Sequence, residues 1–167
     1  MGHRKVIIGY TQGTFDTLHF GHVNLLKNAK EHCDFLIVGV NSDELVLKYK
    51  NKETIIKETD RKEIVSAIKY VDKVIICDSL DKLEQYKNIK FDLIFIGDDW
   101  KGHPRWEKTK LDLKQYGVDV IFIPYTQGIS TTIVKEKMIK NKSGSWNDKT
   151  KADKAYVVNP QNWTRKI

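Results

Sequence analysis

The stretch Phe35-Leu36-Ile37-Val38-Gly39-Val40 is a continuous apolar run that is rich in β-branched residues. Such a run is typical of a strand that is buried on both faces, as strands are in the middle of a parallel sheet. Similar runs recur along the chain: Val6-Ile7-Ile8, Val74-Ile75-Ile76, Leu93-Ile94-Phe95-Ile96 and Val118-Asp119-Val120-Ile121-Phe122-Ile123. The sequence therefore predicts about five buried strands.

The segments between these runs carry apolar residues at helical spacing. Three stripes are visible: Leu25, Leu26 and Ala29; Ile64, Val65 and Ile68; Leu111, Leu113 and Tyr116 before Gly117. Alternation of strands and helices predicts an α/β fold in which right-handed crossovers place helices on both faces of an open parallel sheet. We therefore expect a Rossmann-like doubly wound sheet of about five parallel strands, with its ligand site beyond the carboxyl ends of the strands.

The length of 167 residues is that of one domain with a tail. We expect the domain to span residues 1–140, because residues 141–167 lose the alternating pattern. That tail holds six Lys or Arg residues and two Asp residues, so its net charge is +4, which is more than half of the +7 of the whole chain. Trp146 and Trp163 suggest that it is partly packed. The rest of the charge is dispersed among acids, so no nucleic acid partner is expected.

No stretch approaches the roughly 18 consecutive apolar residues that a membrane-spanning helix needs. Residues 1–5 do not resemble a secretory signal. We therefore expect a soluble, cytoplasmic protein without a membrane span. Cys33 and Cys77 lie far apart and outside any C-x-x-C pattern, so neither a disulfide framework nor a zinc site is expected.

The segment between Gly13 and His22 has the features of a phosphate site. Gly13 allows a tight turn close to a ligand, and a helix that begins near Gly21 directs its free N–H groups at an anion. His19 and His22 are three residues apart, so both rings can reach one phosphate. A capping pair or metal ligands are the alternatives, although the zinc-protease pattern needs histidines four apart with an adjacent Glu.

Three motifs extend this interpretation. Gly13-Thr14-Phe15-Asp16 followed by His19-x-Gly21-His22 resembles the signature of the cytidylyltransferase family, within the H-x-G-H nucleotidyltransferase superfamily. The family's second motif, R-T-x-G-[IV]-S-T-[TS], is matched over residues 125–132 except at its first position, and the segment Gly97-Asp98-Asp99-Trp100 is a third likeness. The resemblance extends from about Val6 to Lys140. It implies transfer of CMP from CTP to a small phosphorylated alcohol, with glycerol 3-phosphate the favoured acceptor.

The resemblance also implies roles for individual residues. Catalytic roles fall to His19, His22, Lys50 and Lys52, with Lys48 and Lys50 as an alternative lysine pair. Nucleotide-binding roles fall to Thr14, Phe15, Asp16, Gly21, Asp99, Thr126, Gly128, Ile129, Ser130 and Thr131. The acceptor falls to Lys82 and Asp72, with nucleotide binding or a purely structural role at the chain end as alternatives for Asp72. No metal ligands are predicted in the chain, Mg²⁺ or a similar ion is expected to accompany CTP, and a homodimer is expected.

One position departs from the family pattern. Tyr125 stands where relatives have an arginine that faces the nucleotide phosphates, and Gln127 stands in place of the usual acid. Tyrosine donates one hydrogen bond but carries no charge. Three alternatives therefore stay open: another acceptor (phosphocholine, phosphoethanolamine or a sugar phosphate), ATP as the donor, or a nucleotide-binding module without turnover.

Overall fold

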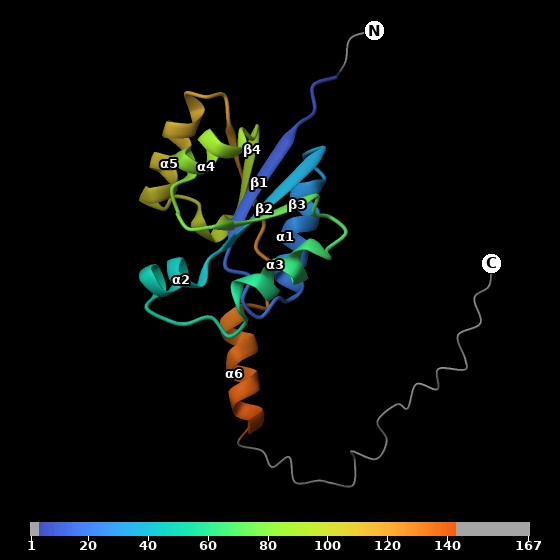
Figure 1. Cartoon of the computed structure of the whole chain (residues 1–167), viewed down its shortest axis with the longest axis vertical. Helices are drawn as coiled ribbons and strands as arrows, with labels where there is room; N and C mark the ends of the chain where they lie inside the picture. Colours follow the sequence, from blue (N-terminus) through green and yellow to red (C-terminus); the bar gives the residue numbers. More distant parts are fainter. Residues whose placement is uncertain (1–3, 143–167) are drawn as a thin grey trace, which may run out of the picture.

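The computed structural model describes residues 4–142. Its centre is a parallel sheet with the strand order β3-β2-β1-β4-β5 (Figure 1). The strands are β1 (Ile8–Gly13), β2 (Phe35–Asn41), β3 (Lys73–Cys77), β4 (Leu93–Gly97) and β5 (Asp119–Ile123). The predicted sheet of five parallel strands is confirmed, although β1 begins two residues later than the apolar run.

Helices cover both faces of the sheet, as predicted. The helices are α1 (Phe20–Lys30), α2 (Asp43–Lys50), α3 (Glu58–Ser66), α4 (Lys82–Ile89), α5 (Pro104–Lys114) and α6 (Thr131–Lys142), with a short 3-10 turn, η1 (Asp98–Trp100). Helices α1 and α3 lie on one face, and α4 and α5 lie on the other (Figure 1). None of the helices in the described residues is long and apolar enough to cross a membrane.

Alternate residues of β2 enter two separate hydrophobic clusters. Val38 packs with Leu26 of α1 on one face of the sheet. Ile37 packs with Trp106 and Leu113 of α5 on the other. All five of these side chains are buried. A strand with apolar partners on both faces needs no polar positions, which is the physical reason that the run Phe35 to Val40 has none.

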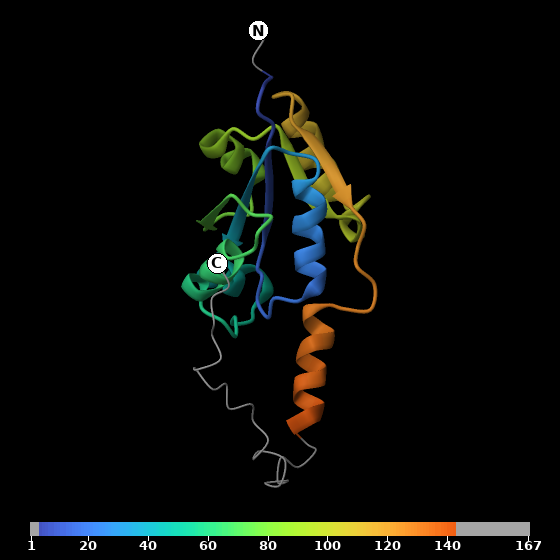
Figure 2. The same cartoon turned by 90° about the vertical axis from the view of Figure 1, so that its right-hand side faces the viewer.

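Two helices were not expected from the sequence. Helix α2 follows β2 directly, and its first turn is capped by Ser42 Oγ, which accepts from Leu45 N at 3.2 Å. Helix α4 is capped by Asp81, which accepts from Leu83 N at 2.8 Å. Helix α6 projects away from the sheet (Figure 2). The predicted tail lies, from residue 143 onward, outside the described residues.

The strand order reverses between β1 and β4. The chain runs outward from β1 to β3 on one side, and then returns to build β4 and β5 on the other. Loops that leave β1 and β4 therefore diverge to opposite faces, which opens a crevice beyond Gly13 and Gly97. Both glycines end their strands, so the motif residues that follow them meet at this crevice.

Candidate active site

The two motif histidines lie side by side at the start of α1. Nδ1 of His19 accepts from Gly21 N at 3.1 Å, and Nδ1 of His22 accepts from His19 N at 3.3 Å. The ring centroids are 4.0 Å apart. Because Nδ1 of each ring is an acceptor, the proton of the neutral ring belongs on Nε2. The helix cap therefore fixes two neighbouring Nε2–H donors.

Burial keeps these histidines neutral. It lowers the pKa of His19, and it lowers the pKa of His22 to about 4, with the charges of His19 and Lys50 adding to the effect. Gly21 makes the ring positions possible: a Cβ there would lie 2.9 Å from Cε1 of His19. Capping and ligand binding are thus compatible, since the cap uses Nδ1 and leaves Nε2.

A cleft with three adjoining parts surrounds this pair. The first part, of about 320 Å³, runs from the histidines to η1 and the loop before α6, and we call it the nucleotide part. It brings together half of the predicted nucleotide-binding residues: Gly21, Asp99, Thr126, Ser130 and Thr131, beside His19 and His22. Burial and the adjacent Asp98 raise the pKa of Asp99. Asp98 itself accepts from Tyr125 N at 2.8 Å, so the two neighbouring carboxylates have different surroundings.

The second part of the cleft, the lysine part, is basic. Its walls include Thr14, His22, Lys50, Lys52 and Lys135. Lys50 Nζ donates to Thr14 Oγ1 at 3.2 Å. Of the two lysine pairs considered, the structure brings Lys50 and Lys52 to the cleft. Lys48 instead pairs with Glu44 at 3.1 Å on the exposed side of α2.

The third part of the cleft, the acceptor part, surrounds Lys82, and its walls include Gln12, Asn41, Trp100 and Arg105. Lys82 is the first residue of α4 and is only 7% exposed. Burial and the nearby Arg105 lower its pKa to about 8. The predicted acceptor residue Lys82 therefore lies in the cleft, in a part that shares Thr14 with the part lined by His22.

Asp72, the other predicted acceptor residue, does not lie in the cleft. Its Oδ2 accepts from Leu36 N and from Lys30 Nζ, both at 2.6 Å. Leu36 is near the amino end of β2, and Asp72 directly precedes β3. The carboxylate of Asp72 therefore lies at the amino ends of the strands, whereas the cleft lies beyond their carboxyl ends. These contacts do not support an acceptor role for Asp72 and favour the alternative, in which its carboxylate ties the segment before β3 to the start of β2 and to α1.

Asp16 and Phe15 line the lysine part of the cleft, although both side chains are almost fully buried. Asp16 is 4% exposed, and its carboxylate accepts from the backbone N–H groups of Ile55 and Ile56 and from Lys135 Nζ at 2.8 Å. Burial alone would raise the pKa of Asp16, but these donors lower it below its usual value. Phe15 lies in the core, 5.4 Å from the His22 ring between centroids. Both residues therefore form buried parts of the wall of the lysine part.

The loop before α6 is held by its own hydrogen bonds. Tyr125 Oη donates to Ile129 O at 3.1 Å, and Gly128 makes the turn with a φ of 80°. Ser130 Oγ caps α6 by accepting from Ile133 N at 3.2 Å. Ile129 lies close to Gly21: a Cβ at position 21 would be 3.5 Å from Cγ2 of Ile129. The loop thus packs on the start of α1 and completes the nucleotide part.

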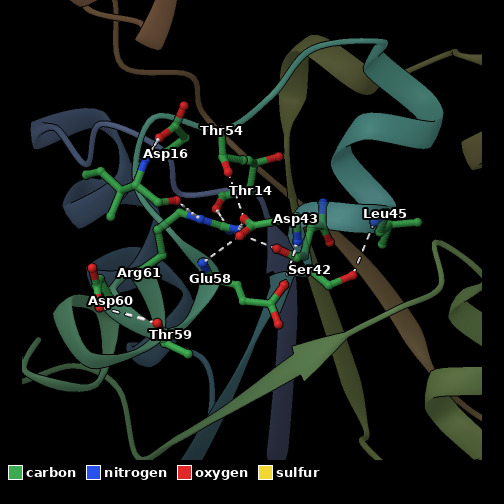
Figure 3. A network of polar contacts seen from close by, with 12 residues as sticks. Thr14, Asp16, Ser42, Asp43, Leu45, Thr54, Glu58, Thr59, Asp60 and Arg61 are labelled. Carbon is green, nitrogen blue, oxygen red and sulfur yellow. Dashed lines mark hydrogen bonds and ion pairs between the residues drawn. The ribbon is translucent and has the colours of Figure 1, made fainter.

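Arg61 is a residue that motif reasoning missed as part of the site. Its guanidinium group is fully buried and donates to the carbonyl oxygens of Ile56, Thr14 and Asn41, and to Asp43 (Figure 3). It therefore ties the ends of β1 and β2 to the loop that carries Lys52. Gln12, Arg105 and Lys135 were missed as well. Their partners are distant in sequence, and no local pattern identifies them.

Comparison with known proteins agrees with this arrangement. A family model described as Cytidylyltransferase-like matches residues 10–137. The glycerol-3-phosphate cytidylyltransferase of Bacillus subtilis (strain 168) is 38% identical over 136 residues, which are 81% of this chain and 97% of that protein. The FAD synthase of Pyrococcus abyssi is 43% identical over 122 residues, 72% of this chain and 80% of that protein.

Among solved structures, the lipopolysaccharide core biosynthesis protein from Thermoplasma volcanium GSS1 superposes with a TM-score of 0.62 at 28% identity. The match covers 73% of this chain and 98% of that one. Fold, motif positions and sequence identity over most of the chain agree: the protein belongs to the cytidylyltransferase-like family of nucleotidyltransferases.

Proposed function

We propose that the protein transfers CMP from CTP to glycerol 3-phosphate, giving CDP-glycerol and pyrophosphate. One observation carries the proposal: the histidine pair lies where the nucleotide part and the lysine part of the cleft meet, and the acceptor part adjoins both, sharing Thr14 and Lys50 with the lysine part and Trp100 with the nucleotide part. A reaction between two anionic substrates needs such an arrangement, since both phosphates must meet at one centre. The likeness to the Bacillus subtilis enzyme, which covers 97% of that protein, supports this donor and acceptor.

The proposed step is an in-line substitution at the α-phosphorus of CTP. An oxygen of the acceptor phosphate forms the new P–O bond, and the bond to the bridging oxygen of the β-phosphate breaks, so that pyrophosphate leaves with the electron pair. The attacking phosphate is largely ionised near neutral pH, so no side chain has to remove a proton. Catalysis then depends on positioning and on stabilisation of charge.

The side chains of the cleft can supply both. The Nε2–H groups of His19 and His22 donate to oxygens of the α-phosphate as charge accumulates there. Lys50 and Lys52 neutralise the leaving pyrophosphate. Thr131 and Ser130 supply hydroxyls beside a helix start, which is favourable for phosphate. Asp99 is proposed to contact the nucleoside.

Mg²⁺ is proposed to enter as part of the substrate, bound to the phosphates of CTP. Within residues 4–142, no group of three or more His, Cys, Asp or Glu side chains could hold a metal ion. A cage made by the protein is therefore not part of the proposal. The ion would screen the phosphates as they approach the lysine part.

Pyrophosphate release from a panel of substrates tests the function. The four nucleoside triphosphates are each combined with glycerol 3-phosphate, phosphocholine, phosphoethanolamine and a sugar phosphate. We expect turnover with CTP and glycerol 3-phosphate to exceed every other pair by at least tenfold. A higher rate with another donor or acceptor would refute the assignment, and CTP binding without pyrophosphate release would favour a module without turnover.

A matched pair of lysine variants tests the lysine part. Lys52→Gln removes a cation from the cleft, whereas Lys48→Gln removes one from the same segment outside it. We expect Lys52→Gln to lower kcat/KM for CTP by about tenfold or more, the usual cost of losing a hydrogen bond to a charged group. Lys48→Gln should stay within twofold of the wild type. Equal effects would remove Lys52 from the proposed mechanism.

Three further expectations belong to this proposal. The catalytic unit is residues 1–140, with the tail as an appendage. Its compartment is the cytoplasm, and its assembly is a homodimer. Light scattering of the full chain and of a chain ending at residue 140 would test the assembly and the domain boundary together. A monomer in both cases would contradict the dimer, and loss of folding in the shorter chain would contradict the boundary.

A further inference from the structure

Two basic side chains meet in the acceptor part of the cleft without a carboxylate partner. Lys82 Nζ and Arg105 Nη2 both donate to the carbonyl oxygen of Leu80, at 3.0 and 3.3 Å. Neither takes part in any of the ion pairs found between residues 4 and 142. Two cations placed this close repel one another, and an anion between them relieves the repulsion.

Gln12 fixes where the ammonium group of Lys82 lies. Its Oε1 accepts from Lys82 Nζ at 2.7 Å and from Tyr10 Oη at 2.9 Å. Its Nε2 donates to Asn41 Oδ1 at 2.7 Å and to Ser79 O at 2.9 Å. Because both ends of the amide have matching partners, the group cannot flip, and its oxygen stays directed at Lys82.

The remaining hydrogen-bond capacity points to an anionic ligand. An ammonium group has three N–H donors, and Lys82 uses two of them for Gln12 and Leu80. Arg105 is exposed and makes one hydrogen bond through Nη2, so most of its planar fork is available for a phosphate. Lys82 and Arg105 line the same part of the cleft, next to Trp100.

The resemblance already implies that Lys82 binds the acceptor. We propose that Arg105 joins Lys82 in binding the phosphate of the acceptor, and that Gln12 is the residue that positions Lys82. The inference rests on the proposed function and narrows its substrate class to phosphate monoesters of uncharged alcohols. A doubly charged phosphate gains from both cations. The ammonium groups of phosphocholine and phosphoethanolamine would be repelled by them, so these acceptors are discriminated against.

Steady-state kinetics separate this role from a structural one. Arg105→Gln and Lys82→Met should each raise the KM for glycerol 3-phosphate by about 10- to 100-fold, with the KM for CTP within twofold of the wild type. Lys108→Gln removes an exposed cation one turn further along α5 and should change neither. Arg105→Lys should recover part of the loss. A wild-type acceptor KM in Arg105→Gln would overturn the assignment.

The pH profile tests the role of Gln12. In the wild type, kcat/KM for the acceptor should fall as the pH rises through about 8, because Lys82 then loses its proton. Gln12→Glu places a carboxylate beside the ammonium group and favours its charged form. In Gln12→Glu, the fall in kcat/KM for the acceptor, which is the alkaline limb of the pH profile, should therefore occur at higher pH. The KM for the acceptor should rise. A limb that stays at its wild-type position would show that Gln12 does not position Lys82.

A binding measurement keeps the inference testable without turnover. Titration calorimetry should show that the wild type binds glycerol 3-phosphate. The affinities of Arg105→Gln and Lys82→Met for the same compound should each be at least tenfold lower. That result supports the anion site even if no pyrophosphate is released from CTP, which would refute the proposed function alone. Equal affinities in all three proteins would refute the anion site while leaving the function intact.

Discussion

Replacing Arg61 should destabilise the protein more than replacing any exposed basic residue. Arg61→Met keeps the apolar stem of the side chain but deprives three carbonyl oxygens and Asp43 of the guanidinium donors (Figure 3). Removing one partner of a buried charged pair costs about 3–5 kcal/mol. The carboxylate of Asp43 is 41% exposed and can be hydrated, so we expect about 3 kcal/mol.

Urea unfolding followed by circular dichroism measures this loss. The free energy of unfolding of a domain of this size is about 5–15 kcal/mol, so a variant that loses about 3 kcal/mol should still fold. Lys62→Met, which removes a cation from the next position of α3, is the control and should change stability by less than about 0.5 kcal/mol. Arg61→Lys keeps the charge but not the fork, and it should recover less than half of the loss.

Arg61→Met should also impair catalysis, because Arg61 holds the backbone of Thr14 and Asn41, and both of these residues line the cleft. We expect kcat/KM for CTP to fall by at least tenfold in protein that is fully folded under assay conditions. A loss of stability below about 1 kcal/mol, or equal stability of Arg61→Lys and the wild type, would refute the view that the guanidinium group joins these segments.

Three shorter predictions concern the loop and the histidine pair. Asp16→Asn should lower stability by about 2 kcal/mol in urea unfolding, because its amide must replace an anion that accepts from Ile55, Ile56 and Lys135. Gly21→Ala should lower kcat more than tenfold with little change in melting temperature: the new Cβ displaces the His19 ring, while alanine favours the helix. The third concerns pH. The pKa of His22 is lower in the folded chain than in the unfolded one, so the unfolded chain binds more protons between pH 4 and 6.5, and stability should fall as the pH decreases through this range. Relative to His22→Gln, the wild type should lose about 2–3 kcal/mol between pH 7 and pH 4; parallel curves would contradict the lowered pKa.

The sheet could be predicted from the sequence because burial on both faces leaves a local record. The runs around Val38 and Ile94 contain no polar residue, and that pattern is visible without tertiary information. The sequence pattern of helices α2 and α4 is weaker. Each has eight residues and is held mainly by its cap, Ser42 or Asp81, and such caps also occur in ordinary turns.

The site could be predicted only where residues are close in sequence. His19, Gly21 and His22 act within one helical turn, so their spacing carries the information. Asp16 and Asp72 have the right chemical type, but contacts with residues 36 or more positions away decide what they bind. Arg61 and Lys135 reach partners 47 and 119 positions away, and nothing in their neighbourhoods marks them.

The uncharged Tyr125 shows why charge in the cleft has to be judged in the folded chain. Tyr125 lines the nucleotide part of the cleft, where its hydroxyl donates to Ile129 O of the same loop and brings no charge. Helix α6, which follows that loop, brings Lys135 to the lysine part, beside Lys50 and Lys52. Since Lys135 also pairs with Asp16, it both holds α6 and adds positive charge where the leaving pyrophosphate is proposed to lie. A motif without an arginine therefore does not leave the cleft without cations, because the segment at the end of α2 and helix α6 both supply them.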